Sequence, residues 1–152
     1  MAHKQLSEIM DMAIQFETDA SEFYSTAADI AKDPSAKTLL KEFEAIELKH
    51  KEKLESFNLD GIADEHHTVP KTHDLHVSDY LVDKEVTPDS TSQDIMVHAM
   101  KREQKAYEFY ARMLKVVTSD DVKSLFEELA EEELEHKEKI EVEYDDVVYK
   151  EN

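Results

Sequence analysis

Two short stretches of the sequence carry residues that could bind a metal: ELKHKEK at 47–53 and ELEHKEK at 133–139. Each contains a Glu and a His three residues apart, and the two pairs are Glu47 with His50 and Glu133 with His136. On a helix this spacing places both side chains on the same face. Carboxylate oxygen and imidazole nitrogen together suit iron or manganese, and zinc is also compatible. In a chain this rich in Glu, however, one such match by itself usually marks a solvated helix face.

The two matches belong to a longer internal repeat. At a constant offset of 86 residues, 37–55 and 123–141 share ten of nineteen residues, and 9–24 and 95–110 share eight of sixteen. Apolar residues recur with helical periodicity in these segments, so the repeated unit is a helical hairpin that is present twice. Solenoid repeats usually need three or more copies. The predicted fold is therefore all-α, with two duplicated hairpins packed face to face as a four-helix bundle.

Turn and capping residues predict where the helices begin and end. The predicted helices cover about 7–32, 35–57, 92–117 and 121–144. Ser7 and Ser35 can act as N-caps, and Asp33-Pro34 breaks the first hairpin at its turn. Residues 58–90 form the predicted crossover, with a short helix at 78–82. The crossover is long enough to run the length of the bundle, and we expect both hairpins to start at the same end. Residues 1–152 are expected to form one domain.

Each predicted hairpin also keeps one Glu within the apolar stripe of its first helix, Glu17 and Glu103. Glu17 and His50 lie equally far along the sequence from the first turn, and Glu103 and His136 lie equally far from the second turn, at 119–120. Residues equidistant from the turn of an antiparallel hairpin lie at similar depth. Each hairpin therefore places two Glu and one His at one level, midway along its helices.

Six such groups in a bundle core would be destabilising without compensating positive charge. An unpaired buried carboxylate costs several kcal/mol or becomes protonated. Two divalent metal ions would satisfy all six groups. One Glu from each of two helices, plus Glu-x-x-His from each of the other two, is the ferritin-like di-iron or di-manganese pattern. The alternative is a duplicated acidic bundle that holds no cofactor.

These residues resemble the rubrerythrin branch of the ferritin-like di-iron proteins. AIQFETDASEFY followed by LLKEFEAIELKH resembles the first half of its pattern, and AMKREQKAYEFY with LFEELAEEELEH resembles the second half. The resemblance extends over nearly the whole chain except 58–90 and the C-terminal tail. It implies a non-haem di-iron oxidoreductase that acts on peroxide or O₂, and the alternative is an iron-binding, ferroxidase or storage protein. It also implies that two metal ions are bound by Glu17, Glu47, His50, Glu103, Glu133 and His136, with Glu47 and Glu133 bridging.

The resemblance also bears on four other residues, two tyrosines, one Ala and one Glu. Tyr24 and Tyr110 each follow the first Glu of their hairpin by seven residues, on the same helix face. Similar tyrosines in the family hydrogen-bond ligand carboxylates, whereas the alternative is an ordinary core Tyr. Ala106 stands where rubrerythrins commonly have an additional Glu that takes part in redox-linked ligand rearrangement, which puts the usual peroxide chemistry in question. Glu44, one turn before Glu47, is either a supplementary ligand or a surface residue.

Composition excludes several classes of function. The formal net charge of −19 argues against binding to nucleic acid or to an anionic membrane surface. The sequence contains no Cys, no signal peptide and no apolar run long enough to cross a membrane, so we expect a cytoplasmic protein. Full-length rubrerythrins carry a rubredoxin-like domain with Cys-bound iron. Because this sequence has no Cys, the resemblance implies that electrons come from a separate rubredoxin-like protein.

The remaining predictions concern assembly and the histidines and methionines outside the pattern. The resemblance implies a homodimer. The crossover histidines fit no single helix face, so a designed metal site there is not the preferred interpretation; they are His66, His67, His73 and His76. His3 and His98 have no obvious partners in the sequence. The methionines at helical spacing are interpreted as core residues; they are Met10, Met12, Met96, Met100 and Met113.

Overall fold

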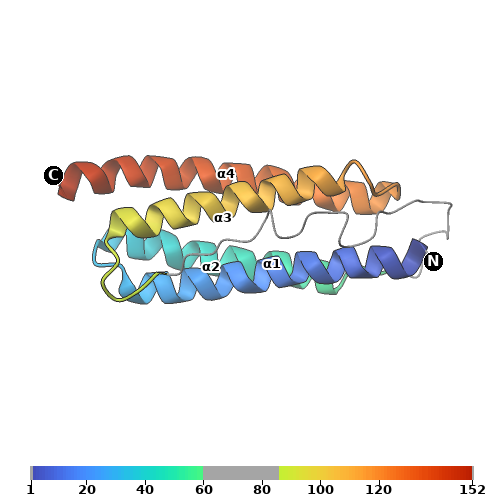
Figure 1. The fold of residues 1–152 in the computed structure, drawn as a ribbon, viewed down its shortest axis with the longest axis horizontal. Coiled ribbons are helices and arrows are strands. Elements are labelled where there is room, and N and C mark those ends of the chain that lie inside the picture. Colours follow the sequence, from blue (N-terminus) through green and yellow to red (C-terminus); the bar gives the residue numbers. More distant parts are fainter. Residues whose placement is uncertain (1, 60–85, 152) are drawn as a thin grey trace.

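Four helices make up most of the computed structural model, which describes residues 2–59 and 86–151. They are α1 (Ala2–Ile30), α2 (Pro34–Glu55), α3 (Ser92–Met113) and α4 (Asp120–Glu151) (Figure 1). α1 packs along α2, and α3 packs along α4, so each pair is an antiparallel hairpin. The two hairpins meet mainly through α2 with α4 and α1 with α3. The described residues contain no strand, and the predicted all-α bundle is confirmed.

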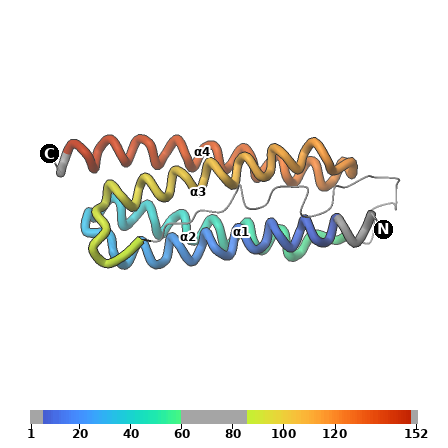
Figure 2. Tube along the Cα trace, in the orientation of Figure 1, coloured from blue at the N-terminus to red at the C-terminus, as the bar shows by residue number. Residues whose placement is uncertain are grey.

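The two hairpins run in opposite senses along the bundle. Figure 2 shows α2 and α3 running in the same direction, with α3 beginning beside the turn between α1 and α2. The expectation that both hairpins start at the same end is therefore wrong. α2 finishes near the end of the bundle where α1 begins, so a connection that spans the bundle must start α3 at the opposite end. The predicted helix at 78–82 and most of the predicted crossover lie outside the described residues.

Side-chain caps fix the start of two helices. The carboxylate of Asp33 accepts a 2.9 Å hydrogen bond from the backbone N–H of Ala36, so Asp33, not Ser35, is the N-cap of α2. Pro34 then occupies the first helical position, where its missing N–H has no partner to lose. Thr91 caps α3 in a reciprocal arrangement with Asp94, each side chain accepting a 3.1 Å hydrogen bond from the other's backbone N–H.

Three other boundaries differ from the predicted ones by several residues. α1 begins at Ala2, and Ser7 lies inside it, because the apolar stripe continues back to the buried Leu6. α4 continues past residue 144 to Glu151, because Val147 is buried two turns after Ile140. α3 ends earlier than predicted, at Met113, where two N–H groups of the following turn hydrogen-bond to the Met113 carbonyl.

The apolar core consists of two clusters, one towards each end of the bundle. One is built around the buried rings of Phe109, Tyr110 and Phe126. The other contains Tyr24 and Phe43. The predicted core methionines all pack into these clusters: Met10, Met96 and Met113 are buried, and Met12 and Met100 are partly buried. Between the two clusters every helix carries buried polar residues, and these form the candidate site.

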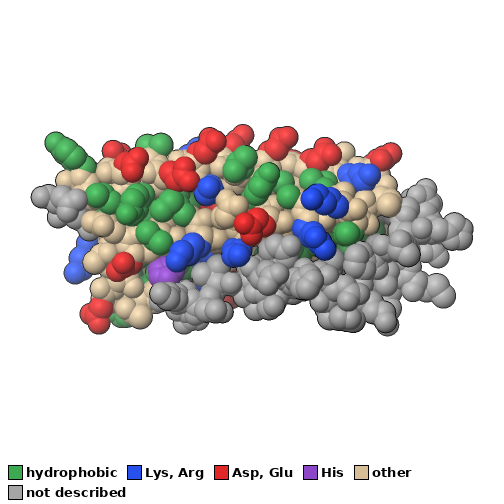
Figure 3. All heavy atoms as spheres, turned by 45° about the horizontal axis from the view of Figure 1, so that its top comes forward, with side chains coloured by type: hydrophobic (Ala, Val, Ile, Leu, Met, Phe, Trp, Pro, Cys, Tyr) green, Lys and Arg blue, Asp and Glu red, His purple; other side chains and the backbone are tan. Residues whose placement is uncertain are grey.

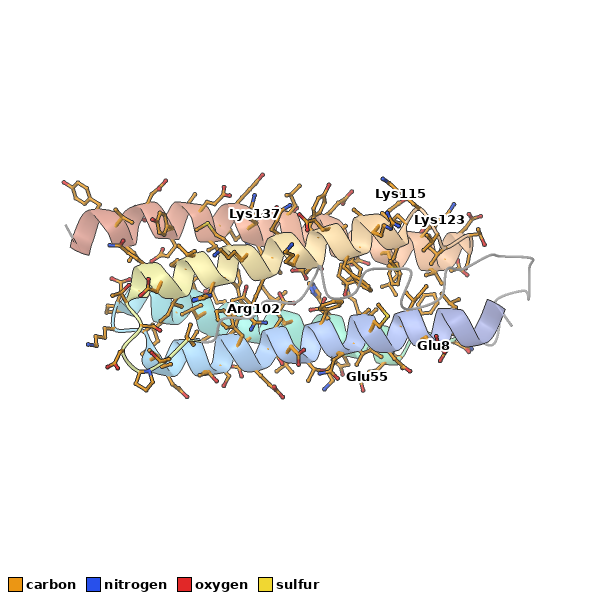
Figure 4. All side chains as sticks on the ribbon, in the orientation of Figure 1. Glu8, Glu55, Arg102, Lys115, Lys123 and Lys137 are labelled. Atoms are coloured by element: carbon orange, nitrogen blue, oxygen red, sulfur yellow. The ribbon has the colours of Figure 1, made fainter. Side chains whose placement is uncertain are left out.

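The outer surface is strongly acidic. Figure 3 shows acidic side chains along the edge formed by α4, with hydrophobic side chains between the charged ones. Figure 4 shows charged side chains pointing away from the bundle, including Lys115, Lys123 and Lys137. Arg102 is different: it lies between α3 and α1, with its guanidinium 4.5 Å from the centre of the Phe23 ring (Figure 4). In the part of the chain that is described, no helix is long and apolar enough to cross a membrane.

Candidate metal centre

Six acidic and imidazole side chains meet in the middle of the bundle. α1 contributes one Glu, α3 contributes one Glu, and α2 and α4 contribute a Glu and a His each. Their exposed fractions do not exceed 4%. The six residues are those predicted from the repeat: Glu17, Glu103, Glu47 with His50, and Glu133 with His136. Their depth follows from the hairpin geometry, because each set is equidistant from its own turn.

The six residues form two overlapping groups of four. In the first, one donor atom from each of Glu17, Glu47, His50 and Glu133 lies within 4.8 Å of the others. In the second, Glu47, Glu103, Glu133 and His136 satisfy the same condition. Glu47 and Glu133 belong to both groups. Two carboxylates shared between two sets of donors is the arrangement that a pair of bridged cations requires.

Both imidazoles direct Nδ1 towards the carboxylates. Nδ1 of His50 lies 3.2 Å from Glu133, 3.5 Å from Glu47 and 3.6 Å from Glu17. Nδ1 of His136 lies 3.3 Å from Glu47, 3.6 Å from Glu103 and 4.0 Å from Glu133. The two rings are almost parallel, with an interplanar angle of 10° and centroids 5.7 Å apart.

Several buried oxygens of the centre have no hydrogen-bond donor among the described residues. They are Oε2 of Glu17, both carboxylate oxygens of Glu47, and Oε2 of Glu103. Leaving a buried carboxylate oxygen without a partner costs free energy, because water no longer solvates it. The donor set therefore fits bound cations. Oxygens and imidazole nitrogens converge on the same place, and the hydrogen bonds among these groups leave several of the oxygens without a partner.

The pKa shifts also reflect the cost of burying several carboxylates close together when no cation is present. Burial, and then the charge of Glu47, raise the pKa of Glu17 to about 8. Burial and three neighbouring carboxylates raise the pKa of Glu133 well above its usual value. Burial lowers the pKa of His50, but the adjacent carboxylates of Glu17 and Glu47 outweigh it and raise that pKa to about 11. Without cations the centre is therefore held together by protons.

Two buried tyrosines extend the centre on either side. The hydroxyl of Tyr110 on α3 donates a 2.7 Å hydrogen bond to Oε1 of Glu17 on α1. The hydroxyl of Tyr24 on α1 donates to Oε1 of Glu103 on α3. Each Tyr therefore binds a Glu of the other hairpin through Oε1, whereas Oε2 of the same Glu is the oxygen that lies 3.6 Å from Nδ1 of a histidine. Both phenols are fully buried, and burial raises their pKa well above 10, so they stay protonated as donors.

Comparison with known proteins identifies the family. The sequence profile of the Rubrerythrin family matches residues 8–144. The chain belongs to the Rubrerythrin family. Among solved structures, it is similar to a hypothetical protein from Pyrococcus furiosus, with 27% sequence identity and a TM-score of 0.72, over 98% of this chain and 94% of the other. No curated protein matches it in sequence. Membership of the Rubrerythrin family implies a di-iron centre, and the buried Glu and His groups are where this chain could hold one.

The other described candidate residues of the sequence do not belong to either group of donors. Glu44 belongs to neither group of donors, although it lies one turn before Glu47. The four crossover histidines lie outside the described residues. His98 is half-buried on α3, and it also belongs to neither group. Of His3 only its position in α1 is described.

Two residues that contact the histidines were not predicted. Glu132 on α4 forms an ion pair with Nε2 of His50. The ring of Phe43 stacks on His136, with centroids 4.9 Å apart. The sequence carries only a weak signal for Glu132, which stands in an unbroken run of three glutamates. Its position in the repeat is informative only by contrast, because the residue at the same offset in the first hairpin is Ile46.

Proposed function

We propose that this chain is a non-haem di-iron oxidoreductase that acts on peroxide or O₂. The observation that supports this best is the pair of overlapping donor groups that share Glu47 and Glu133. One ion would be held by Glu17, Glu47, His50 and Glu133, and the other by Glu47, Glu103, Glu133 and His136. Carboxylate and imidazole donors suit iron, and they also accept manganese or zinc. When bound, two adjacent irons supply the two electrons that reduction of a peroxide requires.

The rest of the centre is suited to hold such ions in a dry interior. The four carboxylates together would balance the charge of two divalent ions, and the two shared ones would contribute to both ions. Tyr24 and Tyr110 would fix the orientation of Glu103 and Glu17 by donating to one oxygen of each carboxylate, which leaves the other oxygen for the metal. Apolar clusters on both sides would keep bulk water from the ligands.

The 152 residues contain no Cys that could hold a rubredoxin-type iron, so they do not themselves include an electron donor of that type. We propose a rubredoxin-like donor. The test is consumption of hydrogen peroxide by the reduced, iron-loaded protein with a supplied rubredoxin. Turnover that depends on both iron and donor supports the proposal. Absence of turnover with any donor, while two irons stay bound, would exclude it.

A second candidate function is iron binding or ferroxidase activity without peroxide turnover. Ala106 favours it, because this half-buried position of α3 has no carboxylate one turn after Glu103. The acidic surface could also attract cations. Size-exclusion chromatography with iron analysis separates the two functions. A cage-sized assembly with many irons per chain indicates storage, whereas a homodimer with two irons per chain indicates redox chemistry.

A further inference from the structure

The two histidines of the centre differ in what contacts their outer ring nitrogen. Nε2 of His50 forms an ion pair with Oε2 of Glu132 from α4. Nδ1 of the same ring lies 3.2 Å from Oε1 of Glu133. Two consecutive glutamates of α4 therefore contact the two nitrogens of one imidazole.

His136 has no such contact. All three of its carboxylate contacts are made by Nδ1, and among the described residues no carboxylate pairs with its Nε2. Its ring instead stacks on Phe43 at an interplanar angle of 30°. At an offset of 86, the residue corresponding to Glu132 is Ile46, which packs against the apolar core. The internal repeat keeps the six ligand residues but not this contact.

The carboxylate of Glu132 contacts His50, although part of the Glu132 side chain is exposed to solvent. Its side chain is 33% exposed as a whole, but Oε2 is buried and the side chain of His50 is 2% exposed. Oε2 of Glu132 and Nε2 of His50 contact each other as an ion pair, and neither atom has a hydrogen-bond partner among the described residues. A carboxylate on the outer nitrogen of a ligating imidazole keeps the proton on that nitrogen, leaves the lone pair on the other, and fixes the plane of the ring. Here the lone pair of His50 would be on Nδ1, which faces the shared glutamates.

We propose that Glu132 is a positioning residue for His50 and that it makes the two metal positions unequal. The ion held by Glu17, Glu47, His50 and Glu133 is the more tightly bound of the two. The ion on the His136 side lacks this support and is the one that is lost first. This inference rests on the proposed di-metal centre, but it does not depend on redox activity.

The test is a titration of the metal-free protein with Co(II), whose visible absorption reports its ligands. Wild type should bind two ions in two steps. The single-ligand variants His50→Ala and His136→Ala assign the steps, and His136→Ala should keep the tighter ion. Glu132→Leu should weaken the His50-side ion by about 10- to 100-fold and leave the other ion nearly unchanged.

Two further variants separate positioning from a merely structural effect. Glu132→Gln keeps an oxygen that can accept from Nε2–H, so it should recover most of the lost affinity and the wild-type Co(II) spectrum. Glu131→Leu introduces the same side chain at the exposed neighbouring position and should leave both steps unchanged. Circular dichroism on each variant establishes that the bundle is folded.

The reciprocal change is Ile46→Glu, which places a carboxylate at the equivalent position beside His136. It should tighten the weaker ion and bring the two steps closer together. If Glu132→Leu alters neither step, or weakens both ions equally, Glu132 does not have this role, although the di-metal centre stands. If wild type binds no Co(II) at all, both this inference and the proposed function are wrong.

Discussion

The hydroxyl of Tyr110 donates a 2.7 Å hydrogen bond to Glu17, although the two residues belong to different hairpins. Tyr24 makes the equivalent contact with Glu103 in the opposite direction. The two hairpins are therefore joined at the candidate metal centre by a reciprocal pair of buried hydrogen bonds. Each bond holds a glutamate that only one of the two donor groups contains.

Loss of one tyrosine hydroxyl should weaken both the fold and the centre. Tyr110→Phe leaves Oε1 of Glu17 buried without its donor, so the free energy of unfolding of the metal-free protein should fall by about 1–3 kcal/mol. Metal affinity should fall by about 10- to 100-fold, chiefly on the Glu17 side. Denaturant unfolding and metal titration measure the two effects. Tyr149→Phe, at a position that is 86% exposed, should change neither.

The two shared glutamates should matter more than the two unshared ones. Glu47→Ala or Glu133→Ala removes a donor from both groups, so each variant should largely lose both ions. Glu17→Ala or Glu103→Ala removes a donor from one group and should weaken one ion. Glu44→Ala, one turn from Glu47, is the matched control and should bind two ions. If Glu47→Ala kept one ion at full affinity, the bridging role would be wrong.

The six ligand residues could be predicted from the sequence because the internal repeat supplies a second, independent example of each. Their common depth follows from counting residues to the turns. The crossed tyrosine contacts could not be predicted in this way, because distance from a turn relates residues of one hairpin and says nothing about the packing of one hairpin on the other. The sequence does not predict the role of Glu132, because the repeat does not include this residue and its neighbours Glu131 and Glu133 are also acidic.

The helix boundaries show a similar limit. Asp33 and Ser35 are both good capping residues two positions apart, and only the observed hydrogen bond to Ala36 distinguishes them. The sequence predicts the end of α4 too early, because the last turns of this helix are mostly acidic on the outside. Val147 continues the buried face there, but one apolar residue in an acidic segment is a weak periodic signal.

The stability of the metal-free protein should decrease as the pH rises. The pKa of Glu17 is raised from 4.5 to about 8, that of His136 from 6.5 to about 9, and that of His50 from 6.5 to about 11. At a pH between the ordinary and the raised pKa of each group, the folded protein binds more protons than the unfolded chain. The free energy of unfolding therefore falls as the pH rises through this range. The melting temperature after chelation should therefore be lower at pH 9 than at pH 6.

Bound metal should counteract this loss of stability at high pH, because cations replace the protons that the centre otherwise needs. The difference in melting temperature between loaded and chelated protein should widen from pH 6 to pH 9. Glu17→Gln, which cannot ionise, should reduce the pH dependence of the chelated form and thereby separate the centre from the general effect of net charge. A chelated wild type that becomes more stable towards pH 9 would contradict these pKa shifts.

The position of Ala106 offers a test of the oxidoreductase proposal. Ala106→Glu adds a carboxylate one turn after Glu103 on α3, where the resemblance to rubrerythrins leads us to expect one. Peroxide consumption by the iron-loaded, reduced protein should rise, because an additional carboxylate could bind the metal when its positive charge increases on oxidation. Lys105→Glu adds the same group at the preceding residue and should not raise it. Equal turnover in both variants and in wild type would show that the residue at position 106 does not limit peroxide consumption.

The most direct test of the central claim is the number of iron ions bound per chain after anaerobic loading with Fe(II) and removal of excess metal. We predict two tightly bound ions in wild type, a visible spectrum that changes on oxidation, and a melting temperature that falls after chelation. Fewer than one tightly bound ion per chain would contradict the claim, and the buried glutamates and histidines would then be a proton-linked core without a cofactor.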